Sequence, residues 1–434
     1  MPPFYDGVCC LDQHFQQDQR AIDMSLPLYA AGLNYTGLGS NTHVVNPEAG
    51  THYRLFDKRF VEAFPECKLW RLTVSLARFL KASQGMGLDP VYVQQVRDAL
   101  DGFHALGCQV ILDAHDWLRE WRVMEELDGF TVGRDRNDPE VYGKRYRISD
   151  RMIIDNKAFD DVELAAYGSK HKKDPRYTYI AHVHHIDKKL RISRWQVMGK
   201  TGAPKHYSKG GIVNTWQNII KEFRDHPAIW GWELMNEPFT AAEPDPTTGQ
   251  TLSVDNWWYE VLQDLVPAVQ VADPNHFVLV DGNFYASASN WSRVSDMLKD
   301  LPDNGKLLYA AHYYVDANGG KWSNQQMTVL PDAGTRPCSN FFDWLKLNGK
   351  RGILTEFGHP PKNESAHIAD KNLVEKANSL NIPVIQWAGG CGWGDTNPTA
   401  VNYDTPSGPV VCKDNINAIK PALSKRLESY DPVQ

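Results

Sequence analysis

Cysteine is scarce in this sequence, with seven residues in 434, and no two of them form a Cys-x-x-Cys pair. This scarcity excludes a scaffold held together by disulfides. A bridge between Cys67 and Cys108, or between Cys391 and Cys412, stays open, with reduced core thiols as the alternative.

Long apolar runs are also missing. No stretch approaches the roughly 18 apolar residues that a membrane-spanning helix needs. Residues Met1–Gly7 lack a basic head followed by an apolar run, so we expect no signal peptide in this chain. A cytoplasmic protein, and a secreted one whose leader was replaced by a starting methionine, both fit this sequence, and the compartment stays open.

The chain has no excess of positive charge, with 46 Lys and Arg against 53 Asp and Glu and a net charge of -7. This balance argues against nucleic acid or an anionic membrane as a partner and favours a neutral substrate. No Gly-x-Gly-x-x-Gly follows the first expected strand, and neither a phosphate loop nor a Gly-x-Ser-x-Gly nucleophile elbow is present. We therefore expect no cofactor and no metal.

What the sequence does contain is a regular alternation of short apolar runs and helical patterns. The expected strands are 26–34, 68–74, 109–115, 231–238, 277–281, 307–312, 352–358 and 383–387, and the expected helices are 56–65, 90–106, 213–223, 256–271, 341–347, 368–380 and 414–428. Eight strands, most with a following helix, predict an α/β fold, a (β/α)8 TIM barrel that forms a single catalytic unit over residues 1–434. An open doubly wound sheet is the alternative.

Residues 117–211 do not fit this repeat. They are polar, rich in Lys, Arg, Asp and His, and far longer than a usual βα loop. Because they leave the carboxyl end of the third strand, we expect an insertion at the carboxyl-end face of the barrel. Within it, residues 177–185 and 190–197 alternate in polarity and predict a hairpin.

Two glutamates lie at the ends of two expected strands. Glu237 comes just before Pro238, which ends its strand because proline cannot donate a ladder hydrogen bond, and Glu356 follows about 120 residues later, a spacing of three βα units. Cleavage of a glycosidic bond needs such a pair, one acid to protonate the departing oxygen and one carboxylate to attack the anomeric carbon. We expect Glu237 to be the acid, with a pKa raised by burial and by the other carboxylate, and Glu356 to be the nucleophile. Two structural glutamates at strand ends are the alternative.

Several motifs support this interpretation. Asn236-Glu237-Pro238, with Thr355-Glu356-Phe357-Gly358 downstream, resembles glycoside hydrolase family 5, whose members are retaining (β/α)8 enzymes. Four further segments resemble motifs of the second, third, sixth and eighth strands of that family: Trp70-Arg71-Leu72, Leu112-Asp113-Ala114-His115, His312-Tyr313-Tyr314 and Gln386-Trp387-Ala388.

The resemblance implies roles for polar residues around the pair. Arg71 is expected to bind Glu356 and hold it ionised, with an ion pair to Glu233 as the alternative. Asn236 is expected to bond a sugar 2-hydroxyl, with a strand-end cap as the alternative. Tyr314 is expected to donate to the nucleophile.

Two histidines and two tryptophans complete the expected site. His115 and His312 orient the acid and bond hydroxyls in this interpretation, and satisfied core histidines are the alternative. Trp387 offers a flat face for a pyranose ring, and Trp393 a second one, where core or loop packing is the alternative.

The family implies a retaining two-step hydrolysis of a β-glycan. Residues 281–291 and 387–395 are similar to loops of its β-1,4-glucanases, so we expect an endo-β-1,4-glucanase acting on a β-glucan polysaccharide or oligosaccharide. A β-mannanase, an exo-acting β-glucosidase or β-1,3-glucanase, and an inactive carbohydrate-binding barrel are alternatives. A metallohydrolase built on His182, His184 and His185 is another. Family members are usually secreted.

The insertion has two interpretations. Its origin beside His115 and its aromatic residues favour a wall at one end of the cleft that biases the enzyme towards short chains or chain ends. A surface or oligomer-contact appendage is the alternative.

Overall fold

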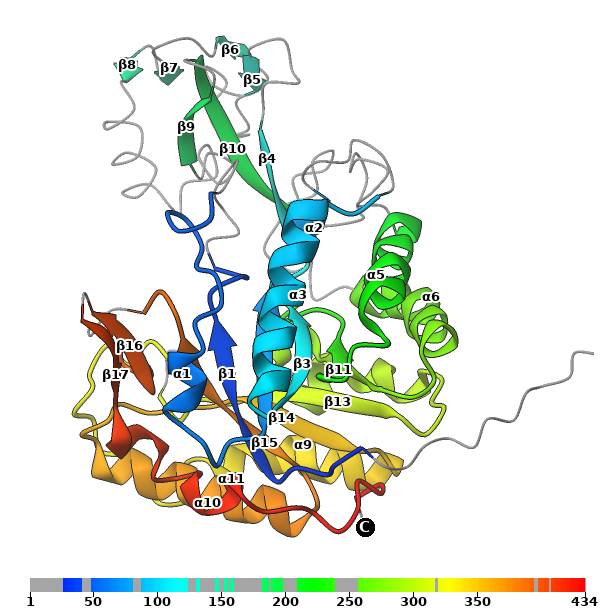
Figure 1. Ribbon diagram of the computed structural model, residues 1–434, viewed down its shortest axis with the longest axis vertical. Helices are drawn as coiled ribbons and strands as arrows, with labels where there is room; N and C mark the ends of the chain where they lie inside the picture. Colours follow the sequence, from blue (N-terminus) through cyan, green and yellow to red (C-terminus); the bar gives the residue numbers. More distant parts are fainter. Residues whose placement is uncertain are drawn as a thin grey trace, which may run out of the picture.

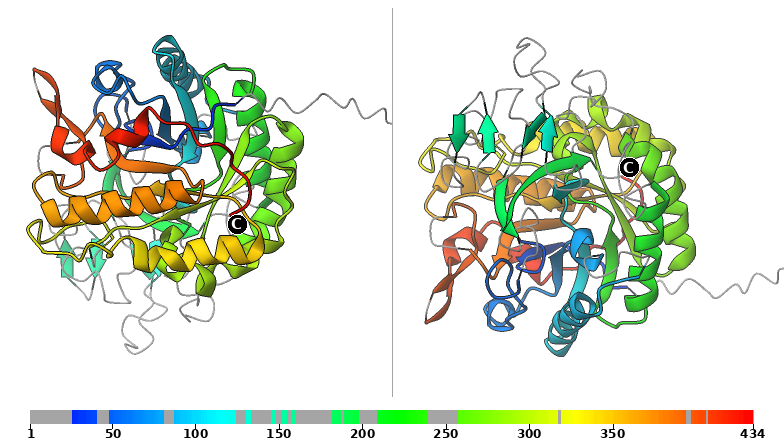
Figure 2. Two further views of the ribbon diagram at one scale, coloured as in Figure 1. Left: turned by 90° about the horizontal axis from the view of Figure 1, so that it is seen from below. Right: turned by 90° about the horizontal axis from the view of Figure 1, so that it is seen from above.

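The structure is a computed structural model that describes residues 26–40, 48–80, 87–123, 130–132, 145–147, 152–154, 157–159, 182–186, 189–197, 209–238, 257–316, 319–393, 397–405 and 407–433. Its centre is a closed barrel of eight parallel strands (Figures 1 and 2). In barrel order these are β1 (Ala31–Thr36), β15 (Val384–Gly390), β14 (Gly352–Glu356), β13 (Leu307–His312), β12 (Phe277–Asp281), β11 (Ile229–Glu233), β3 (Gln109–Ala114) and β2 (Leu69–Val74). The predicted (β/α)8 barrel is confirmed, and the open sheet is excluded.

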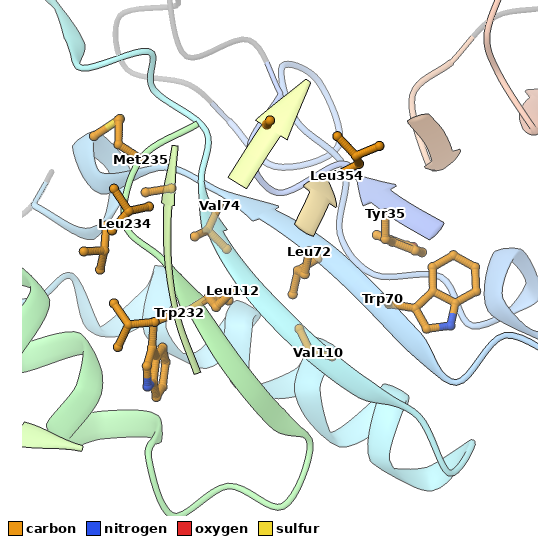
Figure 3. Packing of buried hydrophobic residues seen from close by; sticks show 14 of the residues in the cluster. Tyr35, Trp70, Leu72, Val74, Val110, Leu112, Trp232, Leu234, Met235 and Leu354 are labelled. Atoms are coloured by element: carbon orange, nitrogen blue, oxygen red, sulfur yellow. The ribbon is translucent and has the colours of Figure 1, made fainter. Parts of the chain in front are cut away.

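Helices cover the outside of the barrel. They are α1 (Arg59–Glu62), α2 (Leu76–Phe79), α3 (Pro90–Ala105), α5 (Lys209–Phe223), α6 (Trp257–Ala272), α7 (Asn283–Ala286), α8 (Trp291–Val294), α9 (Thr335–Asn348), α10 (Glu364–Ser379) and α11 (Lys420–Leu423), with 3-10 turns η3 (Ala288–Asn290), η4 (Asp296–Asp300) and η5 (Lys413–Ile416). Outward strand residues such as Trp70, Leu112 and Trp232 pack in the layer between strands and helices (Figure 3). Among the described helices, none is long and apolar enough to cross a membrane.

The inside of the barrel changes from apolar to polar along each strand, because side chains two residues apart in a strand share one face. Leu69, Ile111 and Leu279 belong to an apolar cluster closed from below by Tyr29 and Tyr430. One step further along β2, β3 and β12, the same face carries charged side chains: Arg71, Asp113 and Asp281. The polar layer therefore lies at the carboxyl ends of the strands.

Several expected elements were wrong in extent. The strand expected over 231–238 is β11, which ends at Glu233, so Asn236 and Glu237 lie beyond its end, and the helix expected over 341–347 is the longer α9. Residues 26–30 do not join the first strand, where Pro27 cannot donate to a ladder, and only Ala31–Thr36 pairs. The expected helix 56–65 shrinks to α1. Residues 414–428 form η5 and α11 in place of one helix, because Pro421 is tolerated only in the first turn and the helix must restart beside it.

The segment after β3 contains strands of its own. β4 (Arg119–Val123), β10 (Lys189–Val197) and β9 (His182–Ile186) form an antiparallel sheet, which Figure 1 draws above the barrel on the side towards which β1 points. The predicted pairing is confirmed for 182–186 with 189–197, while 177–181 and 187–188 lie outside the described residues. Two small hairpins join β5 (Phe130–Val132) to β6 (Arg145–Arg147) and β7 (Met152–Ile154) to β8 (Lys157–Phe159). A further hairpin, β16 (Asn402–Thr405) and β17 (Gly408–Val411), follows β15.

The cysteines that the structure describes, Cys67, Cys108, Cys338, Cys391 and Cys412, are all unbridged. Both bridges left open by the sequence are therefore absent, and Cys67 and Cys108 are buried core thiols.

Candidate active site

Two carboxyl groups face each other at the carboxyl end of the barrel. Glu356 is the last residue of β14, and Glu237 follows the end of β11 by four residues. An oxygen of one lies within 4.8 Å of an oxygen of the other. Retaining glycosidases hold their two carboxyl groups about 5–5.5 Å apart, whereas inverting enzymes need roughly 6.5–9.5 Å to admit a water. The separation therefore fits a retaining pair.

Arg71 organises the polar layer from a fully buried position. Its Nη1 donates to Glu356 Oε1 at 2.8 Å, and its Nε and Nη2 donate to the two oxygens of Glu233 at 2.6 and 2.9 Å. Both partners considered from the sequence are thus present together. Asp113 lies 3.2 Å from Nη2 as well, and the surrounding carboxylates raise the pKa of Arg71 although burial alone would lower it. The cation is locked in its charged form.

Asn236 is oriented by the same guanidinium. Its Oδ1 accepts from Arg71 Nη2 at 2.7 Å, so the amide nitrogen points the other way. That Nδ2 is buried and has no hydrogen-bond partner among the described residues. A buried donor without a partner is costly, and a ligand hydroxyl would satisfy it. The bond from Asn236 to a sugar 2-hydroxyl, with a strand-end cap as the alternative, stays a prediction.

Glu237 is held by Asp281 at the end of β12, by His312 at the end of β13 and by Trp117 in the segment between β3 and β4. Its backbone has a positive φ of 46°, and its N–H donates to Asp281 Oδ2 at 2.8 Å. Its Oε2 accepts from the indole Nε1 of Trp117 at 3.1 Å, and its Oε1 lies 2.9 Å from His312 Nδ1. Burial raises the pKa of Glu237 above the ordinary carboxyl value, against the opposing effects of His115 and the Trp117 N–H. Burial, and not the charge of Glu356, is therefore the cause of the raised pKa.

Glu356 accepts a hydrogen bond on each oxygen. Arg71 donates to Oε1, and the hydroxyl of Tyr314 donates to Oε2 at 2.8 Å. A register shift between β13 and β14 sets His312 opposite Glu356, and Thr355 Oγ1 also reaches His312 Nε2 at 3.0 Å. Two consecutive residues of β14 thereby contact one imidazole. Burial lowers the pKa of His312 to about 4, so the ring is neutral at ordinary pH.

The two predicted histidines differ in position. His312 contacts the acid Glu237, as expected. His115 instead bonds Asp113 Oδ2 at 2.8 Å through Nδ1 and stacks on Trp387, with ring centroids 5.2 Å apart and planes 8° from parallel. Burial lowers its pKa to about 4. His115 therefore supports Trp387, and among the described residues no hydrogen bond joins it to Glu237.

Two cavities lie beside the carboxyl pair. One of about 250 Å³ is lined by Thr36, Gly39, Ser40, Thr73, His115, Trp117, Trp387, Cys391, Gly392 and Trp393. The other, of about 590 Å³, is lined by Glu237, Phe284, Tyr285, Ser287, Ser289, His312, Tyr313, Tyr314, Asp316, Gly319 and Lys321. In the first, the rings of Trp387 and Trp393 meet edge to face at 5.8 Å. Both predicted tryptophans thus line one cavity.

Carboxylate and imidazole atoms also come close enough to suggest a metal. Glu233, Asp281 and His312 form one such group, and Glu237, His312 and Glu356 another, each with its atoms within 4.8 Å. Both ring nitrogens of His312 already contact Glu237 and Thr355, so hydrogen bonding accounts for the arrangement. The side chains of His182, His184 and His185 lie outside the described residues. The absence of a cofactor stays a prediction.

Two contacts of the site were missed from the sequence. Asp281 ends β12 and binds the Glu237 N–H, a position that its place at a strand's carboxyl end could have indicated. Trp117 lies in the segment assigned to the insertion, and its bond to Glu237 spans 120 residues of sequence. Nothing in a single sequence points to that pairing.

The fold and the paired carboxyl groups together define a (β/α)8 barrel of the glycoside hydrolase type. Residues 172–391 match the family described as Cellulase (glycosyl hydrolase family 5), and the chain belongs to that family. Endo-beta-1,4-glucanase B of Emericella nidulans is 28% identical over 185 residues, 42% of this chain and 52% of the relative. Endoglucanase 3 of Humicola insolens is 27% identical over 154 residues, 35% and 38% of the two chains. The chain thus matches about half the length, or less, of these curated relatives.

Solved structures show the same fold. Pseudomonas stutzeri endoglucanase Cel5A in complex with cellobiose superposes with a TM-score of 0.65 at 20% identity, covering 94% of this chain and 98% of that one. Cel5A (EG2) from Hypocrea jecorina gives a TM-score of 0.58 at 15% identity, with 90% and 98% covered.

Proposed function

We propose that this protein is a retaining glycoside hydrolase that cleaves β-1,4-glucan, with endo-β-1,4-glucanase activity. The observation that carries the proposal is the carboxyl pair itself. Two carboxyl groups with oxygens within 4.8 Å of each other stand in unlike surroundings: Glu356 lies beside a cation and a phenol, whereas desolvation raises the pKa of Glu237. Such a difference separates a nucleophile from a proton donor.

The first step forms a covalent intermediate. One oxygen of Glu356 attacks the anomeric carbon while Glu237 gives its proton to the departing glycosidic oxygen. The bond between the anomeric carbon and that oxygen breaks in the same step. The sugar ring rests against Trp387, and its 2-hydroxyl accepts from Asn236 Nδ2, a bond that strengthens as the transition state develops. Arg71 and Tyr314 keep the nucleophile oriented as an anion.

The second step releases the sugar. Glu237, now a carboxylate, takes a proton from water, and the water oxygen displaces Glu356 from the anomeric carbon. Two inversions return the product to its original β configuration. The neutral imidazole of His312, between Thr355 and Glu237, holds the acid in place through both steps.

The linkage rests on the relatives. The Emericella nidulans relative is an endo-beta-1,4-glucanase by name, the Humicola insolens relative is an endoglucanase, and the similar Pseudomonas structure is a complex with cellobiose. The flat aromatic lining around Trp387 and Trp393 suits a flat, neutral glucan chain.

A substrate panel tests the proposal. Reducing sugar should be released from carboxymethylcellulose and cello-oligosaccharides, and the product first seen by NMR should be the β anomer. Glu356→Gln and Glu237→Gln should each reduce kcat by several orders of magnitude. Release from mannan or β-1,3-glucan without release from the cellulosic substrates would reject the linkage. Turnover unchanged by either substitution would reject the site.

A further inference from the structure

The segment that joins β3 to β4 passes directly over the acid. After Ala114 ends β3, four residues lead to Arg119, where β4 begins. Trp117 and Leu118 both have positive φ values, 53° and 57°, a conformation that residues other than glycine rarely adopt. A strained pair of this kind persists only where its surroundings hold it.

The surroundings of Trp117 do hold it. On one side, Asp116 accepts from the Ser75 hydroxyl at 2.8 Å and from the Leu76 N–H at 2.6 Å, which ties this segment to the start of α2. On the other side, Leu118 is fully buried in the main hydrophobic core. The chain is therefore anchored both before and after Trp117, and its indole is presented in a fixed place.

That place adjoins both the cavity lined by Trp387 and Trp393 and the carboxyl group of Glu237. The indole ring meets His115 edge to face at 5.0 Å and lines the cavity of Trp387 and Trp393. Its Nε1 donates to Glu237 Oε2 at 3.1 Å, while His312 occupies Oε1. Trp117 and His312 thus each hold one oxygen of the Glu237 carboxyl group in place.

We propose that Trp117 is a positioning residue for the proton donor: its indole N–H fixes the carboxyl group of Glu237 and stabilises the carboxylate left after the proton has moved to the departing oxygen. The inference rests on the proposed function. A hydrogen bond strengthens when its acceptor becomes charged, so this bond is stronger after proton transfer than before it. Trp117 therefore favours transfer of the proton to a poor leaving group.

A pH profile measures this role. An N–H donor to the carboxylate lowers the pKa of Glu237, so removing the donor raises that pKa. The alkaline limb of kcat/KM reports deprotonation of the acid and should move to higher pH. A substitution at position 117 leaves in place all the other titratable or charged groups near Glu237, which are Arg71, Asp113, His115, Asp281, His312, Tyr314 and Glu356.

The experiment uses the full chain with Trp117→Phe, and with benzothienylalanine at position 117, which keeps the two-ring shape and replaces the N–H by sulfur. Both should move the alkaline limb upward by about half a pH unit or more. Both should lower kcat on cellotetraose roughly tenfold, while a dinitrophenyl cellobioside, whose leaving group needs no proton, keeps nearly its full first-step rate. Turnover of that substrate also shows that the variants fold.

Trp393→Phe is the matched control. It alters another tryptophan of the same cavity, whose indole donates to the Gly389 carbonyl and not to Glu237. It should change KM and leave the alkaline limb in place. If both Trp117 variants keep the wild-type limb while the wild type turns over cellotetraose, the inference is overturned and the proposed function stands. If the wild type cleaves neither cellotetraose nor the dinitrophenyl substrate, the proposed function itself fails.

Discussion

A single guanidinium connects most of the residues that the chemistry needs. Arg71 donates to Glu356, to the Asn236 amide oxygen, to both oxygens of Glu233 and, at 2.8 Å, to Asn34 Oδ1. Five N–H donors in one rigid plane can serve these directions together, whereas an ammonium is a point charge on a flexible stem. The network therefore depends on the shape of arginine as well as on its charge.

Arg71→Lys should for that reason impair both catalysis and stability. We expect kcat to fall at least a hundredfold, because Glu356 and Asn236 lose their shared partner. We also expect the free energy of unfolding to drop by about 1–3 kcal/mol, since the ammonium keeps the charge but cannot donate to all the buried acceptors that the guanidinium binds. Steady-state kinetics and urea unfolding measure the two effects. A lysine variant with wild-type kcat would show that the charge alone suffices.

At the scale of secondary structure, the sequence pattern of a segment determines where its strand lies. The site, by contrast, is formed by contacts between different strands. Expected and observed bounds agree for Phe277–Asp281 and Leu307–His312, because strands buried on both faces are continuous apolar runs flanked by polar residues. The residues of the motifs converge because carboxyl ends of parallel strands share one rim. The same reasoning failed for 414–428, where a single proline outweighed a helical pattern.

What the sequence could not predict are two contacts to Glu237 that no family motif covers, whereas the motifs did predict the contacts of Arg71 and Tyr314 with Glu356. The bond from Glu237 N–H to Asp281 joins the end of β11 to β12 over 44 residues, and the Trp117 contact crosses an even longer interval. Periodicity places a residue on a face of its own strand, whereas these pairings depend on loop paths and on positive φ angles at Glu237 and Trp117. Local pattern carries no information about either.

The bond between Asp281 and Glu237 gives an element-scale prediction. Asp281→Ala removes the acceptor that holds Glu237 in its left-handed conformation, so we expect kcat to fall about ten- to a hundredfold with little change in KM. Asp281→Asn keeps an oxygen acceptor and should retain most of the rate. Measuring kcat and KM for both variants on cellotetraose separates the two outcomes. Equal losses in Ala and Asn would point to the charge of Asp281 and contradict this reason.

For the whole molecule, we propose that the barrel and residues 117–211 act as one catalytic unit, in which the segment walls one end of the cleft. Its first described residue, Trp117, lines the same cavity as Trp387, and β4 starts two residues later. A wall at that end would favour bonds near chain ends within the proposed β-1,4-glucanase activity.

Viscosity measures this effect directly. We expect the viscosity of carboxymethylcellulose to fall slowly for each reducing end released, and cellotetraose and cellopentaose to be cleaved faster per bond than the polymer. An open cleft cuts at random inside chains, which shortens the polymer and thins the solution early. A steep loss of viscosity after few cleavages would show that the segment leaves the cleft open at both ends.

The lower opening of the barrel is sealed by residues from far apart in the chain. The Tyr430 hydroxyl donates to the Tyr29 carbonyl at 2.7 Å, and Leu427 N–H donates to the Leu28 carbonyl at 2.8 Å. Residues 28–29 and 427–430 are therefore neighbours on the face opposite the carboxyl pair. In a variant trimmed to residues 28–430, a short peptide could join the two ends, and a new opening in a distant surface loop would give a circularly permuted protein whose carboxyl pair lies on the untouched face.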